Sequence, residues 1–301
     1  ITAPAGYLLD STPVDVEFTY EGLQIEWQIV DGTNTNLRTS VDISKQDITN
    51  GKELLASFGK RAQWSVKRAQ SMGVHVREIG PDEFDVFADI ERRTGERRGF
   101  ATRGADYFRQ FKQAYGADAH FMLAEIHIAE YVADMTAKRE ALQAKVARLQ
   151  AKYDERPTTR IERQLGEESR NLAAADKRLA EVEGYAKKGD VLPAAASMFV
   201  SHPNEVVYQY SGSLEEYKPF YASALIQYEA MLHLCVEKGV PRYNFYGISG
   251  VFDDPDDEGR GVLEFKQGFN GYVEQMVGKF TLPVDKFRFG VSNLAHKLLR
   301  R

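Results

Sequence analysis

The stretch REALQAKVARLQAKYDERPTTRIERQLGEESRNLAAA, residues 139–175, contains two apolar repeats separated by a proline turn. Spacings of four and three alternate through positions 128, 132, 135, 139, 142, 146, 149 and 153, and again through 161, 165, 168, 172, 175, 179, 182 and 186. Heptad spacing of this kind is typical of helices that pair along one stripe. The pattern predicts an antiparallel coiled-coil hairpin over 128–188, with arms of roughly 26 residues that extend roughly 40 Å. We expect Arg139 to lie over Ala175 and extend its charge outward.

The sequence on both sides of the hairpin alternates between helical and strand patterns. Before it, we expect strands within 1–48, a helix over 51–72, a strand at 74–79, helices from Pro81 toward Arg93 and over 102–116, and a buried strand at 120–128. After it, we expect a strand pair around the turn at 202–204, a helix over 218–238, a strand at 242–249, a short helix at 261–269, a strand at 272–282 and a basic amphipathic helix at 285–300. This order matches an N-acyltransferase-like (GNAT-like) α/β mixed sheet with a hairpin inserted between two strands.

Composition limits the class of protein. The chain has 301 residues with 43% hydrophobic and 28% charged residues, which is ordinary for a globular protein. Its net charge of −5 excludes a uniformly basic nucleic-acid coat, so any RNA contact must come from a local patch. The single cysteine, Cys235, fits a reducing compartment, and no apolar run approaches the ~20 residues that cross a bilayer. We expect a cytoplasmic protein.

Several site motifs fail on one residue each. Acetyltransferases of this fold bind the coenzyme A pyrophosphate with R/Q-x-x-G-x-G/A, but QSMGVH places His75 where a small residue is needed. An EF-hand loop that begins at Asp254 has Phe265 at its twelfth position, which cannot bind calcium. Ser249 lacks the second glycine of a nucleophile elbow. We therefore expect neither acetyl-CoA nor calcium.

The histidines and the cysteine give no other site. The six histidines have no zinc-like spacing, and we expect His120 and His127 to flank a strand. Cys235 falls on an apolar helix face, as a core thiol does. The sequence predicts no metal site and no cofactor.

Two groups of cations remain. The first is a basic face on the 51–72 helix that includes Trp64 and consists of Lys60, Arg61, Lys67 and Arg68. This face suits phosphate or RNA, with the indole available for stacking; the alternative is a solvated surface. In the second, Arg103 and Tyr107 stand four residues apart on one helical face. A guanidinium and a phenol together suit a diphosphate; the alternative is a structural pair.

Lys266 lies between Phe265 and Phe269 in a segment that follows several glycines. We expect the two rings to exclude water and lower the local dielectric constant. An ammonium there stabilises a developing oxyanion far better than it does in bulk water. The alternative is an exposed lysine beside the edge of the core.

At these residues the chain resembles the Fem-type aminoacyltransferases, which build peptidoglycan interpeptide bridges. The resemblance rests on RYNFYGISG, the FK-x-x-F segment at 265–269, EVVYQYSGS, FYASALIQYEAM and the inserted hairpin, in the family's order. It implies transfer of an amino acid from aminoacyl-tRNA to the stem peptide of a lipid-linked or UDP-linked muropeptide.

The resemblance also implies roles for residues. Lys266 would act near the reacting carbonyl with Phe265 beside it, and Arg103 and Tyr107 would hold a nucleotide diphosphate. Tyr208 and Tyr246 would line the substrate pocket. The hairpin would help to hold tRNA through phosphate contacts, and the basic 285–301 segment would give peripheral contact with the inner face of the membrane.

Family members carry two acyltransferase-like domains, which predicts the domain organisation. We expect 1–48 to be the remnant of a first domain in a fragment that begins at Ile1, 49–127 with 189–301 to form the second domain, and 128–188 to form the arm. The alternative function is a non-catalytic interaction protein that recruits a partner through this arm.

Overall fold

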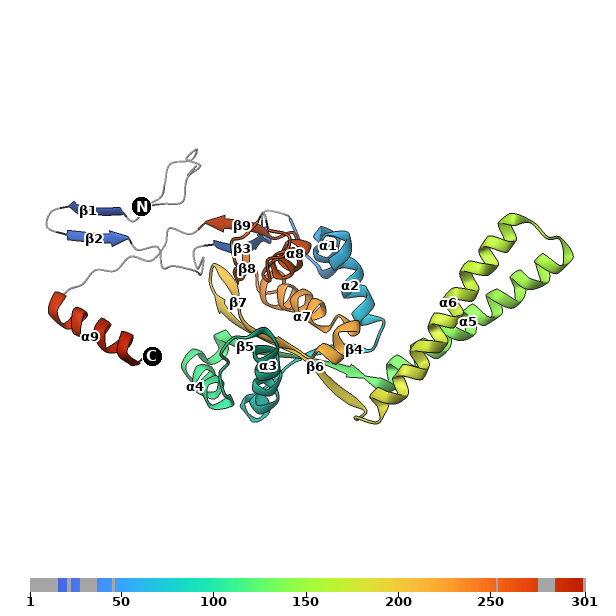
Figure 1. The fold of residues 1–301 in the computed structure, drawn as a ribbon, viewed down its shortest axis with the longest axis horizontal. Coiled ribbons are helices and arrows are strands. Elements are labelled where there is room, and N and C mark those ends of the chain that lie inside the picture. The colour runs from blue at the N-terminus through green and yellow to red at the C-terminus, as the bar shows by residue number, and fades with distance from the viewer. Residues whose placement is uncertain are drawn as a thin grey trace. The chain divides into compact units, whose positions relative to one another are not determined.

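A seven-stranded mixed sheet forms the centre of the fold, in the strand order β4-β5-β6-β7-β8-β3-β9 (Figure 1). The strands are β3 Leu37–Asp42, β4 Val74–Glu78, β5 Ala119–His127, β6 Val191–His202, β7 Glu205–Ser213, β8 Arg242–Gly247 and β9 Tyr272–Gln275. Neighbours from β4 to β7 are antiparallel, whereas β7 and β8 are parallel, with Val206 opposite Tyr243 and Val207 opposite Asn244. The computed structural model describes residues 16–20, 23–27, 37–44, 47–252, 254–275 and 285–299.

The chain divides into two units. Unit 1 comprises Ile1–Arg38, Gly247–Arg260 and Val273–Arg301, and unit 2 comprises Thr39–Tyr246 and Gly261–Tyr272. Every predicted site residue belongs to unit 2.

Helices cover the sheet of unit 2 because its central strands are apolar on both faces. β5 reads AHFMLAEIH and its first six residues are all buried, as in a strand with helices on each side. On one face lie α3 (Phe84–Arg98) and α4 (Ala105–Tyr115), where Phe87 and Phe121 each pack edge-on against the Phe108 ring. On the other face lies α7 (Ala222–Ala230), backed by α2 (Lys60–Gln70) (Figure 1).

The helix expected over 51–72 is two helices, so that prediction was wrong in detail. α1 (Gly51–Ser57) ends at Phe58, and α2 begins at Lys60. Gly59 between them is extended, and its N–H donates to the Gly268 carbonyl at 2.8 Å. A Cβ at Gly59 would lie 3.2 Å from that same oxygen. This close approach to α8 (Arg260–Gly268) breaks the helix.

The helix expected over 218–238 is also divided. It consists of a 3₁₀ turn (Glu215–Phe220), α7 and a π-helical turn (Met231–Val236). Pro219 lies in the 3₁₀ turn, and Tyr221 then adopts a left-handed φ of 57° before α7 begins. The left-handed Tyr221 separates the 3₁₀ turn from α7, which accounts for the start of α7 at Ala222.

The inserted segment forms a hairpin of two long helices, α5 (Ile128–Glu155) and α6 (Thr159–Ala186) (Figure 1). The Thr158 hydroxyl accepts the Ile161 N–H at 3.3 Å and caps α6. Most of the expected seam positions are buried or half-buried, but Val132 is 36% exposed and Ala186 is exposed. The neighbouring residues Tyr131, which is 3% exposed, and Tyr185 turn inward instead. At the root of the arm their ring centroids lie 5.1 and 5.3 Å from that of the buried Phe220.

Ion pairs link the two helices of the arm further out. Arg139 Nε lies 2.7 Å from Asp176 Oδ1, and Lys145 Nζ lies 2.6 Å from Glu168 Oε1. Arg139 is therefore held by a carboxylate beside the buried Ala175.

In unit 1, β1 (Val16–Tyr20) pairs antiparallel with β2 (Leu23–Trp27), and α9 spans Lys286–Leu299. The expected strand positions at 14, 29 and 276–282 lie outside the described residues. Among the helices that the structure describes, none combines the length and the hydropathy needed to cross a bilayer.

Candidate active site

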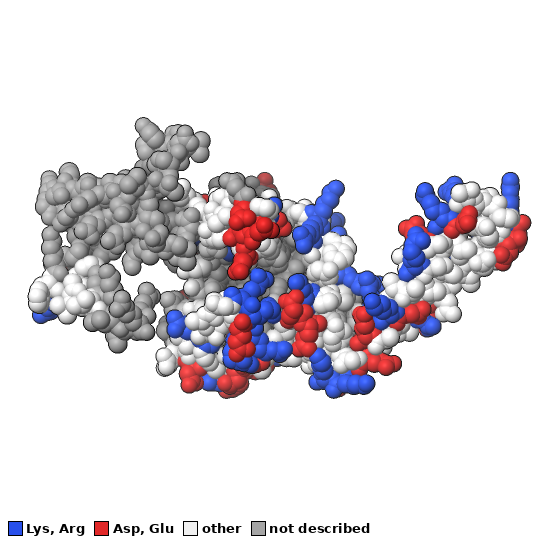
Figure 2. Space-filling model, in the orientation of Figure 1, with Lys and Arg blue, Asp and Glu red and all other residues white. Residues whose placement is uncertain are grey.

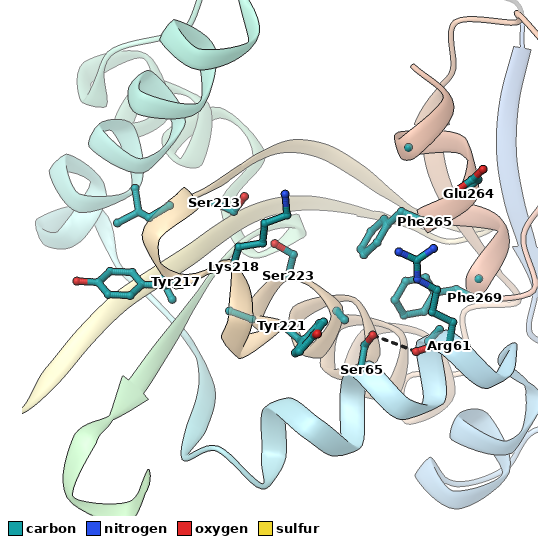
Figure 3. Close-up of a pocket in the computed structure, with 17 residues that line it drawn as sticks. Arg61, Ser65, Ser213, Tyr217, Lys218, Tyr221, Ser223, Glu264, Phe265 and Phe269 are labelled. Carbon is teal, nitrogen blue, oxygen red and sulfur yellow. Dashed lines mark hydrogen bonds between the residues drawn. The ribbon is translucent and has the colours of Figure 1, made fainter. Parts of the chain in front are cut away.

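A cavity of about 340 Å³ lies in unit 2 between α2, α7 and α8, a volume within the range of small-molecule sites (Figure 3). Each wall is a short segment: α2, the ends of β6 and β7, the 3₁₀ turn with the start of α7, and α8. Its polar and aromatic lining residues are Arg61, Ser65, Ser213, Tyr217, Lys218, Tyr221, Ser223, Glu264, Phe265 and Phe269.

α8 presents one continuous face to the cavity. Gly261, Glu264, Phe265, Gly268 and Phe269 line it, at the i, i+3, i+4, i+7, i+8 spacing of a single helical stripe. The Phe265 and Phe269 rings meet edge to face at 5.1 Å. Phe269 is fully buried, so it fixes the Phe265 ring at the cavity wall.

Among the described residues, the charged groups that line this cavity are two cations, Arg61 and Lys218, and one carboxylate, Glu264, and Lys218 also pairs with Glu215 at 3.0 Å. Arg61 extends from α2 toward Phe269 and Lys218 extends from the 3₁₀ turn in Figure 3. The first residues of α7, from Ala222 to Ala224, form another part of the wall, and a helix N-terminus carries a partial positive charge. The Ala224 N–H there already donates to the Tyr221 carbonyl at 3.0 Å. The cavity therefore suits a ligand with an apolar or aromatic part and an anionic group.

Lys266 is buried, at 5% exposure, as the sequence predicted. Burial lowers the pKa of its ammonium from 10.5 to about 8. However, Lys266 does not belong to the cavity lining, because it stands about 100° round α8 from Phe265. Its side chain shares the adjacent buried face with Leu263.

Arg103 and Tyr107 contact one another across one turn, at the N-terminal end of α4. The Arg103 guanidinium carbon lies 5.3 Å from the Tyr107 ring centroid, and the Tyr107 hydroxyl lies 3.0 Å from that of Tyr210. Burial raises the pKa of Tyr210 to about 12. The Arg103 N–H donates to the buried Glu91 carboxylate at 3.4 Å, and burial raises the pKa of Glu91. Arg103 lines a second hollow with Arg92 and Asp89, apart from the first cavity.

The other expected substrate residues lie elsewhere in the fold. Tyr208 stacks on Phe199 at 5.6 Å, and burial raises its pKa. Tyr246 ends β8 with a left-handed φ of 65°, a strained conformation for a bulky residue, and its N–H donates to Asn244 Oδ1 at 2.8 Å. Neither tyrosine lines the cavity beside α8.

The basic face of α2 is present as expected. Lys60, Arg61 and Lys67 are exposed and Arg68 is half-buried. None of these four cations forms an ion pair with a carboxylate in the part of the chain that the structure describes. Trp64 is 53% exposed and meets the Tyr221 ring edge-on at 5.0 Å. Arg61 thus belongs both to this face and to the cavity.

Of the cavity residues, the sequence singled out Arg61, Phe265 and Phe269 individually, and the motifs at 205–213 and 220–231 that carry the family resemblance contain Ser213 and Ser223. Ser65 and Lys218 come from segments that read as ordinary helix surface. The Lys218-Pro219 dipeptide was a usable signal, because it predicts a break in the helix and therefore an exposed helix N-terminus.

Comparisons with known proteins agree on one family. The family model described as "FemAB family" matches residues 17–297. Aminoacyltransferase FemB of Staphylococcus epidermidis is 31% identical over 247 residues, covering 81% of this chain and 58% of the relative. Aminoacyltransferase FemA of the same species is 30% identical over 252 residues, covering 83% and 60%.

A solved structure, "Crystal structure of FemX", superimposes with a TM-score of 0.62 at 25% identity, covering 81% of this chain and 61% of that one. The chain spans about three fifths of the length of each of these relatives.

Proposed function

Because the chain belongs to the FemAB family, we propose that it takes part in an aminoacyltransferase that moves an amino acid from aminoacyl-tRNA to the stem peptide of a peptidoglycan precursor. The product is a residue of the interpeptide bridge. The acceptor is a lipid-linked or UDP-linked muropeptide, and the reaction needs no cofactor.

The architecture supports an N-acyltransferase-like assignment for unit 2. The parallel pair β7–β8, joined by α7, follows an antiparallel series β4–β7, and the cavity lies at the start of α7. In this proposal, residues 49–127 and 189–301 form the second acyltransferase-like domain, 1–48 belong to a first one, and 128–188 form an antiparallel coiled-coil arm.

We assign the cavity beside α8 to the aminoacyl-adenosine end of the tRNA. An adenine ring fits against Phe265 and Tyr221, and the adjoining phosphate fits between Arg61, Lys218 and the α7 N-terminus. The basic face of α2 then continues along the acceptor strand, and the Trp64 ring provides a stacking surface for an unpaired base.

The chemistry is aminolysis of an ester. The neutral amine of the acceptor attacks the ester carbonyl, the carbon–oxygen bond to the ribose breaks, an amide bond forms, and the amine proton ends on the ribose hydroxyl. Such a reaction needs a positioned amine and a stabilised oxyanion more than a protein nucleophile. Lys266 is buried on the face of α8 adjacent to the cavity-lining Phe265, and we assign its ammonium the oxyanion role, which requires its side chain to reach the cavity when the ester binds.

The buried Lys266 is the observation that carries this proposal, and its replacement tests it. In the complete protein, Lys266→Met should lower turnover of charged tRNA plus precursor roughly 100-fold or more, as loss of an oxyanion donor does. Lys238→Met, which removes an exposed lysine, is the matched control. Equal turnover in the two variants would remove Lys266 from the mechanism.

The proposed substrates place the reaction in the cytoplasm. α9 supports contact with the inner face of the membrane, because Phe287, Val291 and Leu294 are exposed on a helix that also carries basic residues.

A further inference from the structure

Two histidines and a glutamate meet where the arm joins the sheet, at a position that shares no residue with the cavity. They are His75 in β4, His127 at the end of β5 and Glu130 in the first turn of α5. One ligand atom from each lies within 4.8 Å of the others. We propose that this cluster, the arm-root site, binds a divalent transition metal of the Zn²⁺ class.

The backbone holds the two imidazoles together. His75 stands opposite Glu125 in the antiparallel register, so His127, two residues further along, lies diagonally across on the same face. The ring centroids are 4.4 Å apart. The His127 N–H donates to the Gly73 carbonyl at 2.8 Å, and Gly73 has a φ of 66°. A Cβ there would lie 2.8 Å from the His127 carbonyl, so glycine permits the close approach of β4 to the arm root.

The carboxylate is supplied by Glu130 because the other nearby carboxylate is engaged. Arg77 donates to both Glu125 oxygens, from Nε at 2.8 Å and from Nη2 at 2.9 Å. Glu130 instead presents one oxygen 2.6 Å from His75 Nε2 and the other 3.7 Å from His127 Nδ1. It therefore spans the two imidazoles.

This donor set suits a metal of intermediate softness. Two imidazoles with one carboxylate match Zn²⁺ and its transition-metal neighbours, whereas Mg²⁺ and Ca²⁺ prefer oxygen ligands. Zn²⁺ bonds nitrogen at about 2.0–2.1 Å and carboxylate oxygen at about 2.0–2.2 Å, so tetrahedral ligands lie roughly 3.3–3.5 Å apart. The three side chains are at least one-third exposed, which allows the small rotations needed to reach that spacing and leaves the fourth position to water.

Metal binding here has a structural consequence. Each metal-bound imidazole offers the lone pair of one ring nitrogen, so the ion takes the place of the direct contact between His75 Nε2 and Glu130. The bound ion then joins β4, β5 and α5 at one point. It fixes the direction in which the arm leaves the sheet.

The test is titration of chelator-stripped protein with Zn²⁺ by calorimetry in a non-coordinating buffer. We expect one saturable site per chain, with affinity at least tenfold weaker in each of His75→Gln, His127→Gln and Glu130→Gln. Co²⁺ should give a visible absorption spectrum that the same variants lose, and Mg²⁺ at equal concentration should not compete. Zn²⁺ should also slow amide exchange at 73–75 and 127–131.

His233→Gln is the matched control. His233 also lies between two carboxylates, Glu229 at 3.1 Å from Nε2 and Glu237 at 2.8 Å from Nδ1. Because these two carboxylates contact different nitrogens of the ring, they cannot bind one ion together with His233. Its replacement should leave Zn²⁺ affinity unchanged. Absence of a saturable site, or equal affinity in the wild-type protein and in arm-root variants that circular dichroism shows to be folded, would overturn the proposal.

Discussion

The Lys266 ammonium gives the proposed reaction a defined pH dependence. Burial places its pKa at about 8, below the value of 10.5 for an exposed lysine. The protonated form is the one that stabilises an oxyanion, so Lys266-dependent turnover should be retained below pH 8 and fall as the pH rises through it. The measurement is kcat/KM between pH 6.5 and 9, corrected for spontaneous hydrolysis of the aminoacyl ester. Lys266→Arg, which stays protonated throughout, should lose this fall; a wild-type rate that is flat across pH 8 contradicts the assignment.

The same pKa makes a prediction about stability. Because the folded pKa is depressed, the unfolded chain binds more protons between pH 8 and 10.5, and stability rises with pH over that window. Lys266→Met should therefore be more stable than the wild-type protein at pH 7, by up to about 3 kcal/mol at 1.36 kcal/mol per pKa unit. Urea unfolding at pH 7 and at pH 10 checks this, since the advantage should shrink at the higher pH. A Lys266→Met protein that is less stable at both values would show that the ammonium contributes to folding.

For individual residues, the sequence predicted that Lys266 is buried, but it did not predict which side chains come together around the cavity. Lys266 is buried, as the flanking phenylalanines led us to expect, although Phe265 faces the cavity and Lys266 lies on the adjacent face of α8. The cavity is different, because Ser65, Lys218 and Ser223 come together through tertiary packing, which leaves no spacing to read. The proximity of the arm-root histidines was not predicted for the same reason: His75 and His127 belong to neighbouring strands far apart in the chain, and metal motifs are recognised by local spacing.

Among the elements, the arm was the most predictable, and its root was the exception. The heptad spacing predicted both helices and most of the buried stripe, because the spacing of residues along one face depends on helix geometry alone. It placed Val132 rather than Tyr131 in the seam, because the spacing assumes that the partner is the other helix. At the root the partner is Phe220 of the core, and the buried stripe moves by one residue.

This shift can be tested with adjacent residues. Tyr131→Ala should destabilise unit 2 by about 3–5 kcal/mol, because it removes a buried ring from Phe220. Val132→Ala should change stability by no more than about 0.5 kcal/mol, since that side chain is partly solvated. Urea midpoints of the two variants provide the comparison. A larger loss of stability in Val132→Ala than in Tyr131→Ala would show that Val132 is the seam residue, as the heptad spacing predicted.

Close packing of β7 on α3 makes a second prediction at the level of elements. A Cβ at Gly212 would lie 2.7 Å from the Ile90 carbonyl oxygen and 2.9 Å from Glu91 Cα, which are both backbone atoms. Gly212→Ala should therefore cost about 1–3 kcal/mol through overpacking. Gly80→Ala, where a Cβ would meet nothing within 4 Å, should be neutral in the same thermal unfolding measurement. Equal melting temperatures of the Gly212→Ala and Gly80→Ala proteins would mean that β7 and α3 can move apart to accept the methyl group with no loss of stability.

For the whole molecule, charge distribution matters more than net charge. The chain carries −5 overall, so attraction to an RNA must come from one region. Along the arm, basic and acidic side chains are interleaved (Figure 2), and Lys138, Arg139, Lys145 and Lys177 each pair with a carboxylate. α2 carries four cations and no acid. The α2 face is therefore the surface that we expect to bind phosphate. Among the described residues the arm also carries cations without a carboxylate partner, such as Arg148, Arg160 and Arg163, but there they alternate with acidic residues.

Salt dependence of tRNA binding distinguishes the two surfaces. Each phosphate contact contributes about −0.7 to −0.9 to the slope of log K against log salt. Changing Lys60, Arg61, Lys67 and Arg68 together to glutamine should reduce the slope by roughly 3. The same change at Lys138, Arg139, Lys145 and Lys177 alters net charge equally but should reduce the slope by less than about 1, because those cations already have protein partners. Filter binding between 50 and 200 mM salt measures the slope for each variant. A larger reduction in the variant of the arm would show that tRNA binds the hairpin rather than the α2 face.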